Sequence, residues 1–168
     1  WQGIFFLNSL TCYVCAASGS NRLSKTTDGG ITWTSIAIPS APYYDVFSPD
    51  DTLIISCSNL GRIQRSSDGG SSWEQINTSG SFFYGMEFYN KDTGFVVGSG
   101  NTILLTTNAG MNWTDRSPFV SASWRQIILK ETNGVKETYV CGGDNFVIKS
   151  TDLGLSWDTI RVTLLDQF

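Results

Sequence analysis

Short runs of hydrophobic residues follow one another along the chain, and Gly, Asn, Asp or Pro separates each run from the next. The runs are rich in β-branched and aromatic side chains, and such runs between turn-forming residues are typical of β-strands. No stretch of sufficient length has the 3.6-residue period of an amphipathic helix. The pattern therefore predicts an all-β protein, with short antiparallel strands in four groups of four.

The predicted strands of the first two groups cover residues 3–7, 12–16, 22–27 and 32–38, and residues 44–47, 53–57, 62–67 and 72–76. Those of the last two groups cover residues 84–89, 94–98, 102–107 and 112–115, and residues 125–130, 138–141, 146–151 and 156–162. The fourth group has extra residues around 131–137. We expect these to lengthen one surface loop and to leave the core pattern unchanged.

An eight-residue motif recurs where the third strand of each group ends. Its form is Ser or Thr, any residue, Asp or Asn, any residue, Gly, two further residues and Trp. The defining residues are Asp28, Gly30 and Trp33; Asp68, Gly70 and Trp73; Asn108, Gly110 and Trp113; and Asp152, Gly154 and Trp157. The tryptophans are 40, 40 and 44 residues apart, and self-similarity at such a period indicates a repeat architecture.

The chemistry of the motif suits a tight corner between two strands. The Asp or Asn side chain can accept hydrogen bonds from backbone N–H groups just ahead of it. The glycine can adopt a positive φ without a Cβ clash. The Ser or Thr can add a hydroxyl bond, and the Trp can cover a hydrophobic layer. We therefore assign these residues a structural role.

Four-stranded units that repeat every forty-odd residues are typical of β-propeller blades. We expect one propeller region over residues 1–168, with blades at about 1–40, 41–80, 81–120 and 121–168. Two interpretations of the ring are open. The four blades belong to a longer propeller, or chains join head to tail in a closed ring, for instance an eight-bladed dimer. Across such a join, the step from Trp157 to Trp33 is 11 + 33 = 44 residues, equal to the preceding step.

Composition narrows the classes of function. The chain has 168 residues, of which 40% are hydrophobic and 13% aromatic, enough for a packed core. A net charge of −4 argues against nucleic-acid binding, which needs a basic face. No run is long enough to span a membrane. No signal sequence is present in this chain, and because it starts at Trp1 rather than Met, that absence decides nothing about location.

The chain has four cysteines, namely Cys12, Cys15, Cys57 and Cys141. The last three occupy the same strand position in different repeats, which lie too far apart for a disulfide. We therefore expect small buried side chains. Cys12 and Cys15 would point to opposite faces of a strand, and the chain has no histidine, so no metal site and no cofactor is predicted.

A candidate binding face lies opposite the motif turns. An aromatic residue stands at or just before the start of each inner strand, and the set is Trp1, Tyr44, Tyr84 and Trp124, with Arg125 beside the last. We favour the interpretation that these residues pack between blades as part of the core. The alternative is that they form a rim that binds a sugar or a peptide. Polar residues in the neighbouring loops are Asn21, Arg22, Asn59, Arg62, Asn101, Asp144 and Asn145.

Two carboxylates, Asp45 and Glu87, are placed on inner strands where they would face a central channel. A glycosidase needs a matched pair of carboxylates, or a Tyr nucleophile with a cluster of arginines. The arginines do not recur at inner-strand positions, and without histidine a Ser–His or Cys–His nucleophile is excluded. We favour a solvated channel-lining role for both carboxylates and assign no catalytic residue.

The eight-residue motif resembles the Asp-box, or BNR, repeat of sialidases, sortilin-type receptors and secreted β-propellers, which usually close with six or more blades. A wider signature, seen in residues 88–98 leading into 103–108 and in residues 6–14 leading into 23–30, resembles the family typified by the photosystem II stability/assembly factor and its secreted bacterial relatives. This resemblance implies a non-enzymatic scaffold for binding or assembly outside the cytoplasm, with a protein or carbohydrate ligand. It does not imply photosynthesis, because relatives occur more widely and the arginine patch expected for that role does not map onto the sequence.

Two other functions stay open at this point. The chain could be part of a secreted Asp-box glycoside hydrolase of the sialidase type, with its catalytic blades elsewhere. It could also be a lectin-like carbohydrate binder that uses the aromatic rim. An arginine cluster with paired acids would favour the enzyme, and glycan binding lost on Trp124→Ala would favour the lectin.

Overall fold

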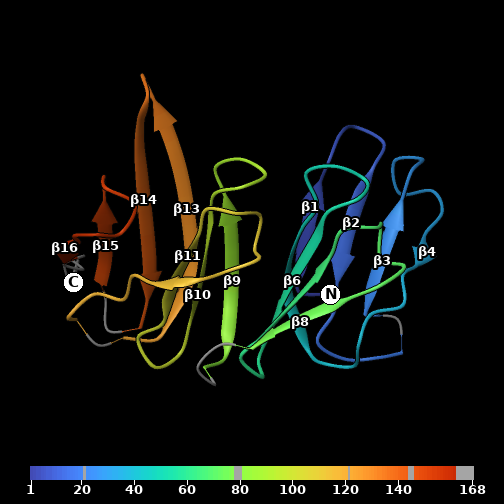
Figure 1. Ribbon diagram of the computed structural model, residues 1–168, viewed down its shortest axis with the longest axis horizontal. Coiled ribbons are helices and arrows are strands. Elements are labelled where there is room, and N and C mark those ends of the chain that lie inside the picture. The colour runs from blue at the N-terminus through green and yellow to red at the C-terminus, as the bar shows by residue number, and fades with distance from the viewer. Residues whose placement is uncertain (21, 78–80, 121, 144–145, 162–168) are drawn as a thin grey trace, which may run out of the picture.

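The computed structural model describes residues 1–20, 22–77, 81–120, 122–143 and 146–161. These residues form sixteen strands in four antiparallel four-stranded sheets (Figure 1). Within these ranges the chain forms no helix that could cross a membrane. The predicted all-β architecture of four four-stranded blades is confirmed.

Each blade takes four strands in chain order. Blade 1 contains β1 (Gly3–Phe6), β2 (Cys12–Cys15), β3 (Leu23–Thr26) and β4 (Thr34–Ser35), and blade 2 contains β5 (Tyr43–Phe47), β6 (Ile54–Ser58), β7 (Arg62–Ser66) and β8 (Glu74–Asn77). Blade 3 contains β9 (Phe83–Phe88), β10 (Gly94–Gly98), β11 (Ile103–Thr106) and β12 (Thr114–Asp115), and blade 4 contains β13 (Trp124–Thr132), β14 (Val135–Gly142), β15 (Phe146–Ser150) and β16 (Asp158–Arg161). The inner strands β1, β5, β9 and β13 contact one another in turn, so the blades stand side by side in chain order.

The extra residues of the fourth blade form regular structure, which corrects the expectation of a longer loop. β13 and β14 remain paired out to Thr132 and Val135, and only two residues connect them. Those residues, Asn133 and Gly134, have φ values of 52° and 78°, the positive pair that a tight two-residue hairpin turn requires. The result is a ribbon that extends beyond the other blades at the top of Figure 1.

The four turns formed by the eight-residue motif, here called Asp-box turns after the repeat that they resemble, share one set of hydrogen bonds. In blade 2, the Ser66 hydroxyl donates to Asp68 Oδ1 at 2.8 Å and accepts from the Gly70 N–H at 2.8 Å. Asp68 accepts from the Ser72 N–H at 2.9 Å and from its hydroxyl at 2.6 Å. The equivalent residues of the other blades repeat these bonds to the backbone. Hydrogen bonds from the Ser72 side chain and backbone and from Ser66 lower the pKa of Asp68 to about 2, so this carboxylate stays charged.

The Asp-box turns of blades 2, 3 and 4 also lie against the preceding blade. Trp73 Nε1 donates across the joint to Ala37 O at 2.7 Å, and Trp157 Nε1 donates to Arg116 O at 2.7 Å. At the middle joint the cross-blade bond comes from Arg65 Nε, which donates to Ala109 O at 2.8 Å. The turns therefore join neighbouring blades as well as closing hairpins.

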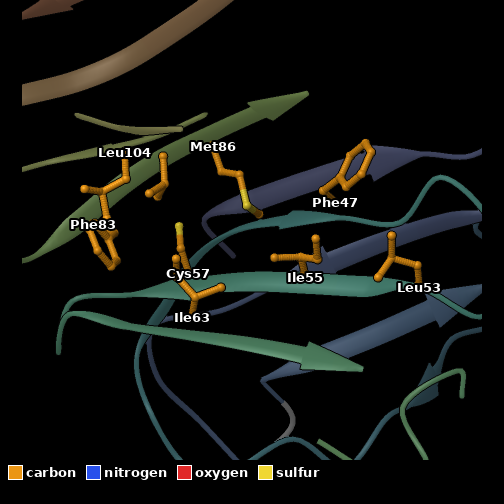
Figure 2. Packing of buried hydrophobic residues seen from close by; sticks show 9 residues of the cluster. Phe47, Leu53, Ile55, Cys57, Ile63, Phe83, Met86 and Leu104 are labelled. Atoms are coloured by element: carbon orange, nitrogen blue, oxygen red, sulfur yellow. The ribbon is translucent and has the colours of Figure 1, made fainter. Parts of the chain in front are cut away.

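The hydrophobic core is divided into three clusters, one at each joint between blades. We call the face of a blade toward the preceding blade its leading face, and the opposite face its trailing face. At the middle joint, Cys57 and Ile63 on the trailing face of blade 2 pack against Phe83 and Met86 on the leading face of blade 3 (Figure 2). The blades are held together mainly by this repeated contact.

The cysteines follow the same division. All four are free, and Cys12, Cys15 and Cys57 are buried as expected. Cys141 is exposed, which corrects the expectation that all four are buried. It occupies the position of Cys15 and Cys57 on the trailing face, but no described blade follows blade 4 and covers it. Among the described residues, no group of three or more His, Cys, Asp or Glu side chains is placed to hold a metal ion.

Substitution of Gly70 tests the packing of an Asp-box turn against the preceding blade. A Cβ at Gly70 would lie 2.4 Å from Ile36 Cγ2, and φ is +89°. We expect Gly70→Ala to lower the free energy of unfolding by about 3 kcal/mol, the sum of positive-φ strain and overpacking. The matched control is Gly134→Ala, which has φ of +78° but nothing within 4 Å of its Cβ, and we expect it to cost ~1 kcal/mol. Equal losses in urea unfolding would contradict this account.

Candidate functional site

The inner-strand starts and the loops between second and third strands lie on one face, here called the strand-start face, at the lower side of Figure 1. Asn59, in the loop between β6 and β7, donates its N–H to Pro42 O, just before β5, at 3.2 Å. On the opposite face, the Asp-box residue Gly69 donates to Thr52 O, in the loop between β5 and β6, at 2.9 Å. The candidate binding residues therefore lie on the face away from the Asp boxes.

A β-bulge interrupts the pairing near the start of the inner strand in blades 2, 3 and 4. In blade 2, Tyr43 pairs with Ser58 and Asp45 pairs with Cys57, so Tyr44 has no partner in the register. The residues at this bulge position are Tyr44, Tyr84 and Arg125. A bulge re-aims a side chain locally, and here it gives three blades an equivalent side chain on the strand-start face.

The residue before each bulge belongs to the core instead. Tyr43, Phe83 and Trp124 are all 0% exposed. Trp124 Nε1 donates to Asn101 Oδ1 at 3.0 Å, so its polar atom is also used. Trp124 therefore does not belong to the binding face, contrary to the rim interpretation. Trp1 has the same position in blade 1, two residues before the Gly3–Cys15 pair, but it is 72% exposed because no described blade precedes it.

The three bulge residues form a row across blades 2 to 4. The rings of Tyr44 and Tyr84 meet edge to face, with centroids 5.9 Å apart. The guanidinium carbon of Arg125 lies 4.1 Å from the centroid of the Tyr84 ring, close enough for a cation–π contact. Arg125 is exposed and both tyrosines are half-buried. The row therefore presents a positioned cation beside aromatic surface.

Charges are sorted between the two faces. Arg22 and Arg62 stand at the starts of third strands and, like Arg125, lie on the strand-start face. Burial raises the pKa of the Tyr43 hydroxyl, and the charges of Arg22 and Arg62 act to lower it, which places both arginines near that residue. None of the described residues in the loops of this face is Asp or Glu. The sequence analysis named Arg22 and Arg62 only as residues of the loops, because their position on a common face follows from the pairing of the strands.

Asp45 links blades 2 and 3. Its Oδ2 accepts from the Met86 N–H on β9 at 2.9 Å, and its Oδ1 accepts from the Val46 N–H at 2.9 Å. Burial raises the pKa of Asp45 to about 6, although these two backbone bonds favour the charged form. Both carboxylate oxygens are thus used by the backbone, which gives Asp45 a positioning role in the structure.

Glu87 lies near Asp45, as the inner-strand positions predict. The two residues line a cavity of about 250 Å³ together with apolar neighbours, namely Ile4, Phe5, Val46, Phe47, Met86 and Phe88. Burial raises the pKa of Glu87 as well. Asp45 and Glu87 are the only two of the eight lining residues with a polar side chain, so few side chains could orient a polar substrate.

Of the other candidate polar residues, Asn101 has structural partners, Asn59 has a buried side-chain oxygen without one, and three fall outside the described ranges. Asn101 Nδ2 donates to Pro118 O at 2.6 Å, and its Oδ1 accepts from Trp124. Asn59 Oδ1 is buried without a hydrogen-bond partner. Asn21, Asp144 and Asn145 lie outside the described residues. The strand-start face is therefore defined by its tyrosines and arginines.

The raised pKa of Asp45 makes a prediction about stability against pH. Between pH 4 and 6 the folded protein keeps a proton on Asp45 that the unfolded chain has lost, so stability falls as pH rises through this window. The free energy of unfolding of the wild type minus that of Asp45→Asn should fall by about 2 kcal/mol between pH 4 and 7. Glu87 titrates in both proteins, and the repulsion between its charge and that of Asp45 is part of the measured difference. Urea unfolding at several pH values measures this difference, and a constant value would refute the assignment.

A family model described as "Photosynthesis system II assembly factor YCF48" matches residues 70–166. A search of curated proteins finds no significant match. Among solved structures, "YCF48 bound to D1 peptide" superposes with a TM-score of 0.69 at 17% identity, over 94% of this chain and 54% of that one.

Two further structures are similar. YCF48 from Cyanidioschyzon merolae has a TM-score of 0.67 at 18% identity, over 98% of this chain and 56% of that one. An ancestral GH74 enzyme has a TM-score of 0.67 at 17% identity, over 94% of this chain and 25% of that one. At these identities the similarity shows the fold, a β-propeller.

This chain thus spans about half the length of the two YCF48 structures. The family match covers 166 − 70 + 1 = 97 of the 168 residues. Because this is more than half of the sequence, and the blades have the fold of the YCF48 structures, the chain belongs to the photosystem II assembly factor YCF48 family of β-propellers.

Proposed function

We propose that this chain is a non-enzymatic scaffold whose strand-start face binds a carboxylate-bearing segment of a partner protein during the assembly of a protein complex. The observation that carries the proposal is the row of Tyr44, Tyr84 and Arg125 across three blades. Arg22 and Arg62 add positive charge to the same face. Arginine is well suited to carboxylates, because its planar fork can donate two parallel hydrogen bonds.

Family membership supports a protein partner. The similar structure named "YCF48 bound to D1 peptide" contains a peptide ligand. An extended peptide fits a row of equivalent positions better than a compact ligand does, because successive side chains can contact successive blades. The proposal names a carboxylate-bearing peptide as the ligand class and leaves the partner protein to experiment.

The row suits a peptide better than a sugar. A sugar ring stacks on an open aromatic face, whereas Arg125 lies over the ring of Tyr84 and Tyr44 meets it edge to face. Trp124, on which the lectin interpretation depended, is buried. We therefore do not extend the proposal to carbohydrate.

The proposal also places the protein outside the cytoplasm, as in the secreted relatives that the repeat resembles. Subcellular fractionation of the native host, with an antibody against this chain, tests that part separately. Recovery in the cytoplasmic fraction would contradict it and would leave the peptide-binding proposal intact.

The binding proposal is tested with a library of octapeptides, each made with a free and with an amidated carboxyl terminus and screened for binding by fluorescence anisotropy. We expect the chain to bind peptides that have acidic side chains or a free carboxyl terminus. Arg125→Ala should weaken the binding of these peptides at least tenfold, because it removes a hydrogen bond to a charged group. It should not weaken binding of peptides that lack a carboxylate.

The matched control is Lys136→Ala. Lys136 Nζ also lies over a tyrosine ring, 5.3 Å from the centroid of Tyr89, but it belongs to the β13–β14 ribbon on the Asp-box side. Its removal should leave peptide affinity unchanged. Equal weakening by both substitutions, or binding that Arg125→Ala does not alter, would contradict the assigned face.

A further inference from the structure

One side chain at the blade joints departs from the repeat. The third residue after the Asp-box tryptophan is isoleucine in three blades and arginine in blade 3, and the set is Ile36, Ile76, Arg116 and Ile160. In blades 1 and 3 the N–H of this residue donates to an equivalent third-strand carbonyl, Leu23 O at 2.9 Å and Ile103 O at 2.8 Å. Arg116 therefore has the backbone position of an isoleucine.

Arg116 faces blade 4 at the third joint. A Cβ on Gly154, in the Asp-box turn of blade 4, would lie 3.0 Å from Arg116 Cβ. The equivalent glycine of blade 2, Gly70, approaches Ile36 at the first joint, and Ile36 packs against the core cluster there. Trp157 Nε1 also donates to Arg116 O at 2.7 Å. The arginine thus takes the place of an apolar side chain that packs between blades.

The guanidinium of Arg116 is only partly satisfied. Nη1 donates to Asp115 O at 3.1 Å, whereas Nε is buried and has no hydrogen-bond partner among the described residues. None of the ion pairs formed by these residues includes Arg116. A buried donor of a charged group is costly without an acceptor, and the isoleucine of the other blades carries no such cost. An acceptor brought by a ligand would remove this cost.

A cavity of about 490 Å³ lies beside this side chain, between blades 3 and 4. Residues 115–120 form its wall on the blade 3 side, and residues 154–157 with Thr159 form its wall on the blade 4 side. Thr159 pairs with Ile148, whose side chain belongs to the core cluster of this joint. The cavity is therefore bounded by two neighbouring blades of this chain. Small-molecule sites have volumes of roughly 300–1,000 Å³, which includes this one.

The polar groups of the cavity favour a ligand with one negative charge. Ser117 Oγ accepts from the Ile103 N–H at 3.1 Å, which leaves the hydroxyl hydrogen of Ser117 to donate to a ligand. The carboxylate of Asp115 belongs to the same wall and accepts from the Ser117 N–H at 2.8 Å. It partly balances the charge of Arg116. A carboxylate, with a single charge, therefore suits the cavity better than a phosphate group with nearly two.

Apolar side chains stand on both sides of the same cavity. Phe119 on the blade 3 side is fully exposed, and Leu155 on the blade 4 side is 73% exposed. The exposure of Leu155 is a property of the repeat, because Met111, at the same motif position in blade 3, is 51% exposed. These two side chains offer apolar surface to the body of a ligand whose charged group reaches Arg116.

We propose that the cavity between blades 3 and 4 binds a small organic carboxylate, with its charged group on Arg116 and Ser117 and its apolar body between Phe119 and Leu155. Nη1 of Arg116 is used by the backbone, so Nε and Nη2 form the edge that donates in parallel to the two carboxylate oxygens. None of the lining residues belongs to the row of the strand-start face. The proposal therefore goes beyond the peptide-binding function and stands without it.

The proposal is tested by NMR titration of the chain with phenylpropionate and with its neutral amide, phenylpropionamide. The probe is the assigned indole N–H resonance of Trp157, which lines the cavity. We expect phenylpropionate to shift this resonance with a Kd of about 1 mM. The amide should bind at least tenfold more weakly, because it has no charge to pair with Arg116. The indole N–H of Trp73, which makes the same kind of cross-blade bond at the first joint, should not shift.

Arg116→Ile gives the sharper measurement, because it restores the residue of the other three blades. It removes the partner of the carboxylate and the unpaired buried donor together. We expect it to weaken phenylpropionate binding at least tenfold without lowering the temperature of thermal unfolding. The matched control is Arg65→Met, since Arg65 Nε has a partner across the middle joint in Ala109 O. That variant should unfold at a lower temperature and bind phenylpropionate as the wild type does.

The proposal is overturned by a Trp157 resonance that does not respond to phenylpropionate, by an equal response to the amide, or by a response that persists in Arg116→Ile. A lower unfolding temperature for Arg116→Ile would also overturn it, because the guanidinium would then have a stabilising partner within the fold. A response only to the capped dipeptide of phenylalanine and glutamate would reject a free ligand and assign the cavity to a partner polypeptide. None of these outcomes bears on the row of the strand-start face.

Discussion

The structure depends on burying the trailing face of each blade against the leading face of the next. A four-stranded sheet has two apolar faces, and a single blade has no partner for either. At the middle joint, Cys57 and Ile63 meet Phe83 and Met86, and the same positions meet at the other two joints. Stability in such a repeat is approximately a sum of blade terms and neighbour terms. The Asp-box turns belong to this contact, because Trp73 and Trp157 each donate a hydrogen bond to the blade before them.

The same contact builds the candidate site. Packed blades bring their inner strands side by side, and the bulges near the starts of β5, β9 and β13 then set Tyr44, Tyr84 and Arg125 in a row. Asp45 fixes two of these strands relative to each other through the Met86 N–H. The row is thus a property of the assembled joints, since no single blade supplies more than one of its members.

The sequence predicted the features that local chemistry determines. The Asp-box turns depend on residues at most a few positions apart, and the spacing of their tryptophans was enough to count the blades. A bulge is different, because it is defined by the residues opposite it on the next strand. Trp124 and Arg125 are adjacent in sequence, and only the pairing of Trp124 with Gly142 and of Gln126 with Cys141 separates a core residue from a surface one. The exposure of Cys141 likewise depends on a neighbouring blade, which its own repeat does not encode.

The net charge of this protein does not describe how its charges are distributed between the two faces. The acids of Asp28, Asp68 and Asp152 are held in turns by hydroxyl and backbone donors that lower the pKa of each carboxyl to about 2. These negative charges are part of the fold, and the topology confines them to the Asp-box face. The arginines at third-strand starts and at the bulge lie on the other face. Among the described residues, a chain with a net charge of −4 can therefore present a basic surface, because the repeat places these acids and these arginines on opposite faces.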